Sequence, residues 1–255
     1  MRLSLVVFRK EVRDHARETR SVLSSLLMAL LGPGVVLLVS LSDRAAGNPA
    51  VLLGMLSVFA LVSSFAGAID IAMDATAGER ERRSLLPLLL NPVGRSAVIA
   101  GKWLAVTLFA LAVSALNCLA TLAVLAWAAP GMLSARLPLI LIWMAVGLVP
   151  LAALGAALSI LVAVACRTTK EAQNALKAVT FVPMIVGMFL VFFPSWAGRV
   201  WFLLPVVGQQ ALVGLPEGQV PIASAALLAA VTLAATVPLL AAATRVLSRD
   251  DIVAV

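Results

Sequence analysis

The chain has 255 residues, of which 62% are hydrophobic and only 12% are charged, and its mean hydropathy is +1.09. A water-soluble domain of this composition would expose a largely apolar surface, so an ordinary soluble protein is excluded and an integral membrane protein is indicated. A net charge of +7 would suggest nucleic-acid binding in a soluble domain, but in a membrane protein it is typical of basic cytoplasmic loops, and no nucleic-acid partner is expected.

The first predicted element is an amphipathic helix over residues 3–20, within an N-terminal unit of residues 1–20. On a helical wheel an apolar face adjoins a basic stripe, and acidic residues lie beyond the stripe. Such a helix can lie in the lipid headgroup region, with a solvated basic leader as the alternative. The apolar run before Arg9 is too short for a signal peptide, so no cleavage is expected. The apolar face comprises Leu5, Phe8, Val12, Ala16 and Thr19, the basic stripe comprises Arg9, Arg13, Arg17 and Arg20, and the acidic residues are Glu11, Asp14 and Glu18.

Residues 21–255 predict a transmembrane domain with six spans. A helix needs about 20 apolar residues to cross a bilayer, whereas a barrel strand needs only about 9 to 11 alternating residues. The fold class is therefore an all-α membrane protein. The six apolar runs are residues 22–41, 51–73, 98–128, 137–164, 175–193 and 220–243.

The basic residues predict the orientation of the chain. Of its 19 Lys and Arg residues, all but Arg44, Arg136 and Arg199 lie in the N-terminal segment, in the connections after the second and fourth spans, or in the tail. The positive-inside rule then places both termini in the cytoplasm, for a multi-pass protein of a bacterial inner membrane.

The second connection contains the stretch AGERERRSLLPLLLNPVGRSAVIAGK, residues 77–102. A charged turn at residues 78–83 precedes a leucine-rich segment that Asn91 and Pro92 close. We expect a short cytoplasmic helix over about residues 79–92, capped by Ser84. Apolar side chains such as Leu85 and Leu86 at such a place indicate a partner surface.

The segment over about residues 195–219 is apolar but does not span. Pro205, Gly208, Gly214 and Pro216 divide it into pieces that are too short to cross a bilayer. We expect external re-entrant helices, or helices along the outer boundary, whose backbone is satisfied by protein or water. An amphipathic outer loop is the alternative.

Catalytic motifs are absent, so the chain is not expected to be an enzyme or to bind a cofactor itself. Gly101 and Lys102 do not belong to a phosphate-binding loop, because Ser96 and Trp103 replace two of the residues that such a loop requires. Any energy from ATP must come from another chain. The two cysteines, Cys118 and Cys166, are interpreted as packing residues.

Few polar groups lie within the apolar runs. Asp70 and Asp74 share one helical face and could form a cation site or proton relay, or could pair at headgroup level with Arg80, Arg83 or Lys177. Polar amides could line an external pathway or form hydrogen bonds across helices. These amides are Asn117, Gln209 and Gln210.

The block from Gly78 to Lys102 resembles the signature of ABC type-2 exporter permeases, closest to the sodium-efflux (NatB-type) branch. Further parts of the sequence agree with this signature. They are Lys10-Glu11 and Arg13-Asp14 in the N-terminal helix, RTTKEAQ at residues 167–173, and Pro205 with Gln209 and Gln210. The resemblance implies a six-helix permease that forms a homodimer or heterodimer and docks two separate ATPase subunits, which bind ATP and Mg²⁺. It assigns ATPase coupling to Glu79, Arg80, Glu81, Arg82, Leu85 and Leu86, and a connecting helix to Lys10, Arg13 and Arg17.

The connection between the first two spans departs from this branch. It comprises only about residues 42–50, where sodium-efflux permeases carry a large external domain. The expected function is therefore export of Na⁺ or of a small or amphipathic molecule. The alternative is a membrane anchor or receptor that recruits an ATPase-like partner without transport.

Overall fold

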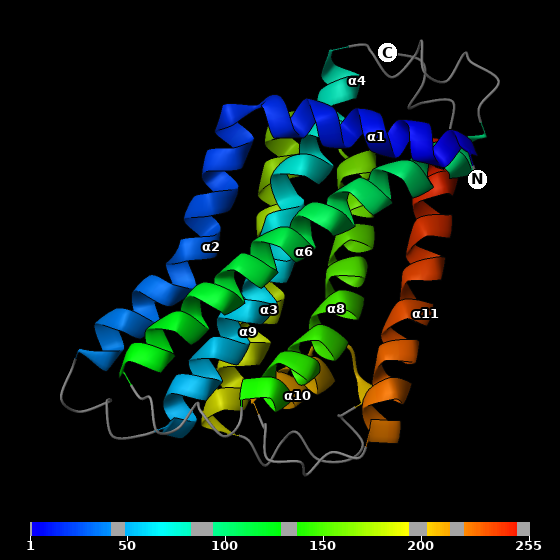
Figure 1. Cartoon of the computed structure of the whole chain (residues 1–255). Coiled ribbons are helices and arrows are strands. Elements are labelled where there is room, and N and C mark those ends of the chain that lie inside the picture. Colours follow the sequence, from blue (N-terminus) through cyan, green and yellow to red (C-terminus); the bar gives the residue numbers. More distant parts are fainter. Residues whose placement is uncertain are drawn as a thin grey trace.

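A computed structural model describes residues 2–41, 49–82, 94–128, 137–193, 203–214 and 222–248 (Figure 1). Every regular element in these ranges is a helix, which confirms the all-α fold class. The predicted pieces at residues 83–92, which include Leu85 and Leu86, and at residues 195–202 and 215–219 lie outside them.

Within the described ranges, six helices are long and apolar enough to cross a membrane, which agrees with the predicted number of spans. Their helical bounds are α2 Thr19–Ser40, α3 Pro49–Met73, α6 Arg95–Ala128, α8 Leu137–Ala165, α9 Thr169–Phe192 and α11 Ile222–Leu247. α6 begins before the expected apolar run and has 34 residues, a length of about 51 Å. It exceeds the hydrocarbon thickness of about 30 Å and runs obliquely across the bundle in Figure 1.

The N-terminal helix α1, Arg2–Arg17, does not continue the direction of α2 but lies across one end of the bundle (Figure 1). The chain bends at Glu18, whose backbone is extended with φ −85° and ψ 96°. α1 packs on the start of α6. The predicted non-spanning helix is therefore present, and it is docked on the bundle.

The centre of the bundle is formed by α3 and α8. In their most apolar stretches 67% and 72% of the residues are buried, against 22% in α2, α9 and α11. Small residues allow the close packing, since a Cβ on Gly155 would lie 3.2 Å from the Phe65 ring. The central helices are therefore buried within this chain, while the peripheral ones keep faces for lipid or another chain.

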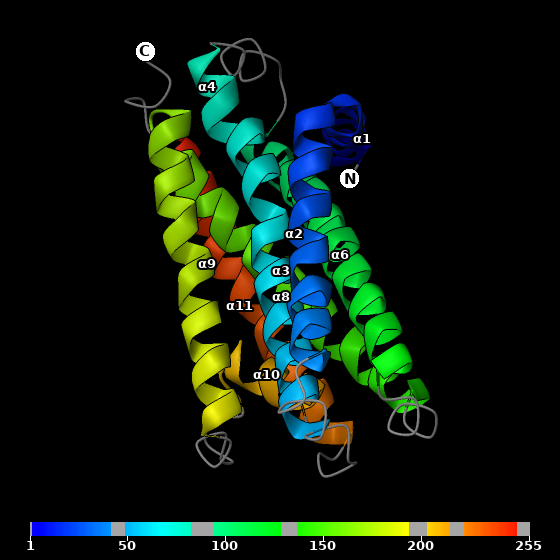
Figure 2. The same ribbon diagram turned by 90° about the vertical axis from the view of Figure 1, so that its left-hand side faces the viewer.

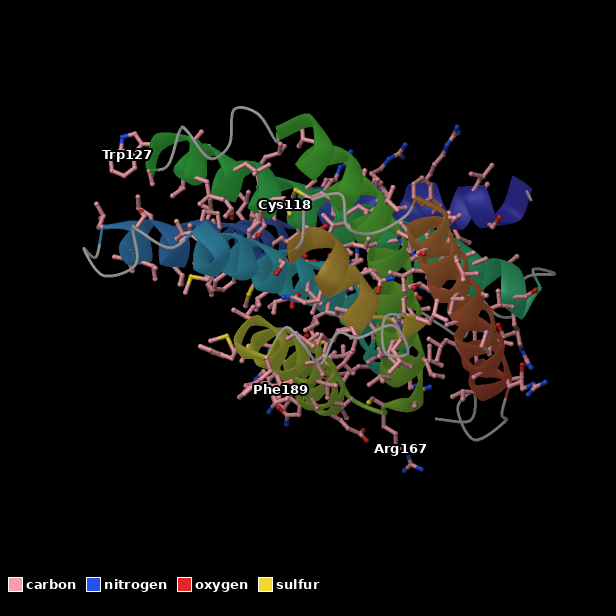
Figure 3. All side chains as sticks on the ribbon, turned by 90° about the horizontal axis from the view of Figure 1, so that it is seen from below. Cys118, Trp127, Arg167 and Phe189 are labelled. Atoms are coloured by element: carbon pink, nitrogen blue, oxygen red, sulfur yellow. The ribbon has the colours of Figure 1, made fainter. Side chains whose placement is uncertain are left out.

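The peripheral faces are strongly apolar. Phe189 on α9 and Trp127 at the end of α6 are 42% and 67% exposed, and Figure 3 shows both at the outside of the bundle, while Cys118 lies between helices. Arg167, between α8 and α9, extends away from the ribbon in the same view. This distribution fits a membrane environment around the bundle.

Two short elements mark opposite ends of the bundle. α3 continues as a π-helix, η1 Asp74–Gly78, and then as α4 Glu79–Glu81, which projects beyond α1 in Figure 2. α10, Val207–Gly214, lies at the other end and packs on α3 and α8. With eight residues α10 spans about 12 Å, too short to cross the membrane.

Candidate functional site: the junction around residues 79–81

The junction is centred on Lys102, which lies in the second turn of α6 and is 1% exposed. Its Nζ lies 3.0 Å from Glu11 Oε1 of α1 and 2.7 Å from Glu79 Oε2 of α4. It also donates to the backbone carbonyl of Ala75 in η1. A buried ammonium is expensive unless it is paired and hydrogen-bonded, and here all three donors are used. One side chain therefore joins three elements.

Lys10 completes a cluster of two cations and two carboxylates. Its Nζ lies 2.6 Å from Glu79 Oε1 and 3.4 Å from Glu11 Oε1. Burial by itself lowers the pKa of Lys10, but the hydrogen bond to Glu79 and the charges of both carboxylates outweigh it and raise the pKa. We call Lys10, Glu11, Glu79 and Lys102 the four-charge cluster.

Gly101 lets α1 approach α6 closely enough to form this cluster. A Cβ on Gly101 would lie 2.7 Å from both the carbonyl oxygen of Ser4 and Cβ of Val7. The buried face of α1 comprises Val7, Glu11 and His15, which are 7%, 3% and 5% exposed.

The sequence interpretation directed the apolar face to the lipid headgroups and set Glu11 beyond the basic stripe, so it did not predict a buried face that contains Glu11. The predicted apolar face stays partly or fully exposed, with Leu5 46% exposed, as a face directed to lipid would be. A helical wheel sorts residues by polarity, and it could not show that Lys102 would neutralise Glu11 from 91 positions away.

Arg80 and Glu81 hold the two helices on the other side of the junction. Arg80 donates from Nη1 to the Cys166 carbonyl at 2.6 Å and from Nη2 to the Val164 carbonyl at 2.9 Å. Val164 is in the last turn of α8 and Cys166 directly follows the helix, where no intrahelical donors remain for these carbonyls. Glu81 accepts from the backbone N–H and the Oγ1 of Thr169, at 3.1 Å and 2.7 Å, at the start of α9.

The start of α9 also carries its own capping arrangement. Thr168 Oγ1 accepts a hydrogen bond from the backbone N–H of Glu171 at 3.2 Å, and Glu171 Oε2 accepts from that of Arg167 at 2.9 Å. The RTTKE stretch therefore fixes the helix start that Glu81 contacts. Residues 79–81, called here the 79–81 turn, bind α1, α6, α8 and α9 through three consecutive side chains.

The other predicted residues of this end are more loosely held. Arg82 Nη2 lies 3.8 Å from Asp74 Oδ1, and its side chain is 68% exposed. Asp70 accepts a hydrogen bond from Ser24 Oγ of α2. Neither aspartate is paired with Arg80, whose guanidinium is directed to α8. Two predicted connecting-helix residues, Arg13 and Arg17, are exposed.

The polar amides form hydrogen bonds between helices. Asn117 Nδ2 donates to the Ala29 carbonyl of α2 at 3.0 Å. Gln209 Nε2 donates to Thr232 Oγ1 of α11 at 2.6 Å, and Gln210 Nε2 to Ser57 Oγ of α3 at 2.7 Å. Both glutamines are buried and attach α10 to the bundle, while a role in an external pathway stays a prediction.

Sequence reasoning missed the roles of Lys102 and Glu11. Lys102 was counted among the basic residues of a cytoplasmic connection, whereas it lies inside the predicted run 98–128. A lysine within an apolar run is itself a signal, since an ionised group there needs a partner. The partners could not be deduced, because Glu11 and Glu79 come from distant parts of the chain.

Comparison with known proteins indicates one family of membrane proteins. The family model described as "ABC-2 family transporter protein" matches residues 5–252. Over 179 residues the chain is 31% identical to the ABC transporter permease protein NatB of Bacillus subtilis (strain 168), a match that covers 67% of this chain and 46% of that relative. With six apolar spans and a family match over nearly its whole length, the chain belongs to the ABC-2 family of permeases, the membrane subunits of ABC transporters.

Proposed function

We propose that this chain is the permease of an exporter that moves its substrate out of the cytoplasm, with ATP and Mg²⁺ bound by a separate ATPase. Two permease copies, identical or related, would pair with two ATPase copies. The cargo would be Na⁺ or a small or amphipathic molecule. The cargo class rests on the sequence resemblance, and the match to NatB covers 46% of that relative's length.

The observation that carries the proposal is the 79–81 turn. Glu79 contacts α1 and α6, Arg80 the end of α8, and Glu81 the start of α9. Separating a buried ion pair costs about 3–5 kcal/mol, so a displacement of the turn would carry its partners with it. A force applied there by an ATPase would therefore reach four helices at once.

The distribution of charge supports an inward position for this end. The four-charge cluster, Arg82 and Arg95 lie at the end where α1 crosses the bundle. With the positive-inside rule, we infer that this end faces the cytoplasm of a bacterial inner membrane and α10 the outside. ATPase contacts by Arg82, Arg13 and Arg17, which are exposed, belong to the same proposal.

The proposal is tested by co-expressing the chain with the ABC ATPase encoded beside it, purifying the complex, and measuring ATP hydrolysis and flux in proteoliposomes. We expect a stable complex, stimulated hydrolysis and ATP-dependent efflux. A complex without ATP-dependent flux would support the anchor alternative, and the absence of any complex would contradict both.

The coupling role of the turn is tested by Glu79→Gln and by the charge reversal Glu79→Lys. Both variants should lower ATPase stimulation, and the reversal should do so more strongly because it sets a third cation beside Lys10 and Lys102. The control is Asp14→Asn, which removes a carboxylate from an exposed position of α1. Full stimulation by membrane-inserted Glu79→Lys would refute the coupling role.

A further inference from the structure

We propose that His15, Glu18 and Asp74 form a binding site for a transition-metal ion of the Zn²⁺ type. One ligand atom from each residue lies within 4.8 Å of the other two. His15 belongs to the last turns of α1, Glu18 to the bend between α1 and α2, and Asp74 is the first residue of η1. The site would thus join α1 and the α1–α2 bend to η1, at the end of the bundle that α1 crosses.

The hydrogen bonding of His15 prepares one ring nitrogen for a metal. Nδ1 lies 3.1 Å from the backbone carbonyl oxygen of Glu11, which can only accept, so Nδ1 carries the proton in the neutral ring. Nε2 then carries the lone pair, and it has no hydrogen-bond partner in the described part of the chain. The residue is only 5% exposed. Metal-binding histidines typically show this pattern, with the second nitrogen donating to a carbonyl.

The two carboxylates are not committed to strong partners. Glu18 is the N-cap residue of α2, yet its side chain makes no capping hydrogen bond. The distance between Asp74 Oδ1 and Arg82 Nη2 is 3.8 Å, which is longer than the roughly 2.8 Å of a charge-assisted hydrogen bond. Arg82 is mostly exposed, and the Asp74 side chain is itself 20% exposed. Arg82 can therefore move away from Asp74 without leaving a fully buried charge. Glu18 is also exposed, so its side chain can rotate toward an ion.

The donor set favours zinc over calcium or magnesium. One imidazole and two carboxylates suit a borderline ion at about 2.0–2.2 Å, whereas Ca²⁺ and Mg²⁺ prefer six or more oxygen ligands, or octahedral oxygen and water. Ligand atoms arranged as a tetrahedron at that distance lie about 3.3 Å apart. The three ligand atoms would therefore have to move closer together by about 1 Å or more when the ion binds. Three protein ligands leave a fourth position for water.

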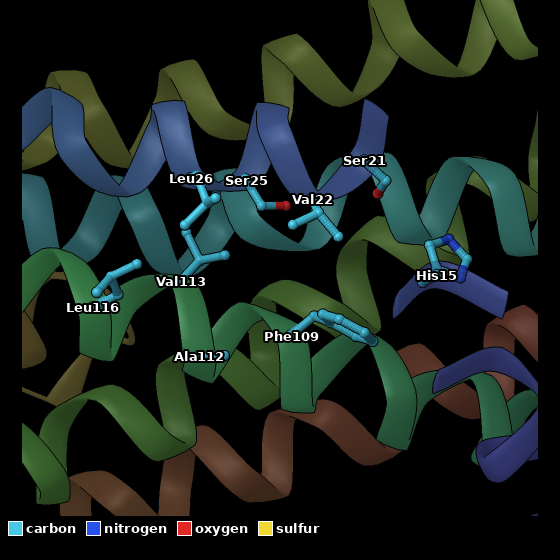
Figure 4. A pocket seen from close by; sticks show the side chains of 9 residues that line it. All are labelled: His15, Ser21, Val22, Ser25, Leu26, Phe109, Ala112, Val113 and Leu116. Carbon is cyan, nitrogen blue, oxygen red and sulfur yellow. The ribbon is translucent and has the colours of Figure 1, made fainter. Parts of the chain in front are cut away.

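His15 also borders a pocket whose lining is mostly apolar. A cavity of about 150 Å³ lies between α2 and α6, with His15 at one end and Ser21 and Ser25 along one wall (Figure 4). Phe109 and Val113 form its apolar side. A bound ion would fasten the α1–α2 bend to η1, immediately before the 79–81 turn, and it would do so whether or not the chain exports its cargo.

The test is direct metal binding by the purified full chain in detergent. His15 is the only histidine of the sequence, so the chain is purified with a histidine-free tag. Co²⁺ is titrated and followed by its visible absorption, and Zn²⁺ is then added in competition. We expect one ion per chain, displacement of Co²⁺ by Zn²⁺, and a higher unfolding temperature with Zn²⁺ present.

Three single variants and a control decide the result. His15→Gln, Glu18→Gln and Asp74→Asn should each weaken binding at least about tenfold, while Asp14→Asn, on the exposed face of α1, should bind as the wild type does. If His15→Gln fails to fold, the exposed Glu18→Gln variant decides. The proposal would be overturned by metal uptake that does not saturate at one ion per chain. It would also be overturned if Glu18→Gln and Asp74→Asn bound the metal with the affinity of the wild type.

Discussion

The ammonium of Lys102 and the carboxylate of Glu79 lie 2.7 Å apart, with side chains that are 2% and 10% exposed. The pair joins the second turn of α6 to the residue that follows η1. Because Glu11 and Lys10 complete the cluster, its two cations and two carboxylates balance. The stability of the junction therefore depends on keeping the charges matched rather than on any one of them.

Lys102→Met should destabilise the protein by about 3–5 kcal/mol, because it leaves Glu11 and Glu79 buried with Lys10 as their only cation. The double variant Lys102→Met/Glu79→Gln should recover part of this loss, since one cation and one carboxylate then remain. Thermal unfolding in detergent measures both effects. Lys170→Met, at an exposed position of α9, is the control. A single variant as stable as the wild type would show that the cluster contributes little.

Gly101→Ala should loosen α1 from α6. The added methyl group would lie 2.7 Å from Ser4 and Val7, and such overpacking costs about 1–3 kcal/mol. Hydrogen exchange should rise in α1 while the spans remain protected. Gly34→Ala is a matched control, because a Cβ there meets nothing within 4 Å and alanine favours a helix. If hydrogen exchange in α1 were equal in Gly101→Ala and Gly34→Ala, the close contact between α1 and Gly101 would be contradicted.

Arg80→Lys should destabilise the junction although it keeps the charge. A lysine cannot reproduce the two parallel donations from a planar guanidinium to the carbonyls of Val164 and Cys166. Losing one of these bonds should cost about 1.5–3 kcal/mol. Hydrogen exchange at residues 164–170 reports the loosened end of α8. As a comparison, Arg167→Lys alters an exposed arginine of the same connection and should leave the exchange unchanged.

Val206→Gly should leave the α10 end of the bundle more stable than Val206→Ala does. Val206 is the one non-glycine residue with positive φ in the described ranges, at 78°, and a β-branched residue is strained there. Both variants lose the side chain that packs on the cluster of Leu61, Phe65 and Leu151, but only glycine relieves the strain, worth about 1–3 kcal/mol against an entropy cost of about 0.5–1 kcal/mol.

The neighbouring change Val207→Gly provides the opposite expectation for the same end. Val207 is the first residue of α10, where glycine relieves no strain and costs helix stability. Val207→Gly should unfold at a lower temperature than Val207→Ala, whereas Val206→Gly should unfold at a higher temperature than Val206→Ala. If Val206→Gly unfolds below Val206→Ala, Val206 is not strained in the native protein.

The sequence by itself determined the fold class, the number of spans and the non-spanning helix at the N-terminus. These follow from local composition, because about 20 apolar residues suffice to define a span and a periodic pattern suffices to define an amphipathic helix. The block from Glu79 to Lys102 also indicated the family, which the match over residues 5–252 confirmed.

Only the tertiary structure decided which charges meet. Glu11, Glu79 and Lys102 are separated by 68 and 23 positions, and no local pattern shows that α1 would turn its acidic residue inward over Gly101. The same holds for His15, because the bend at Glu18 and the π-helix at Asp74 bring three ligand atoms together from separate parts of the chain. Periodicity determines how each helix forms, whereas the pairing of buried charges depends on how the helices pack.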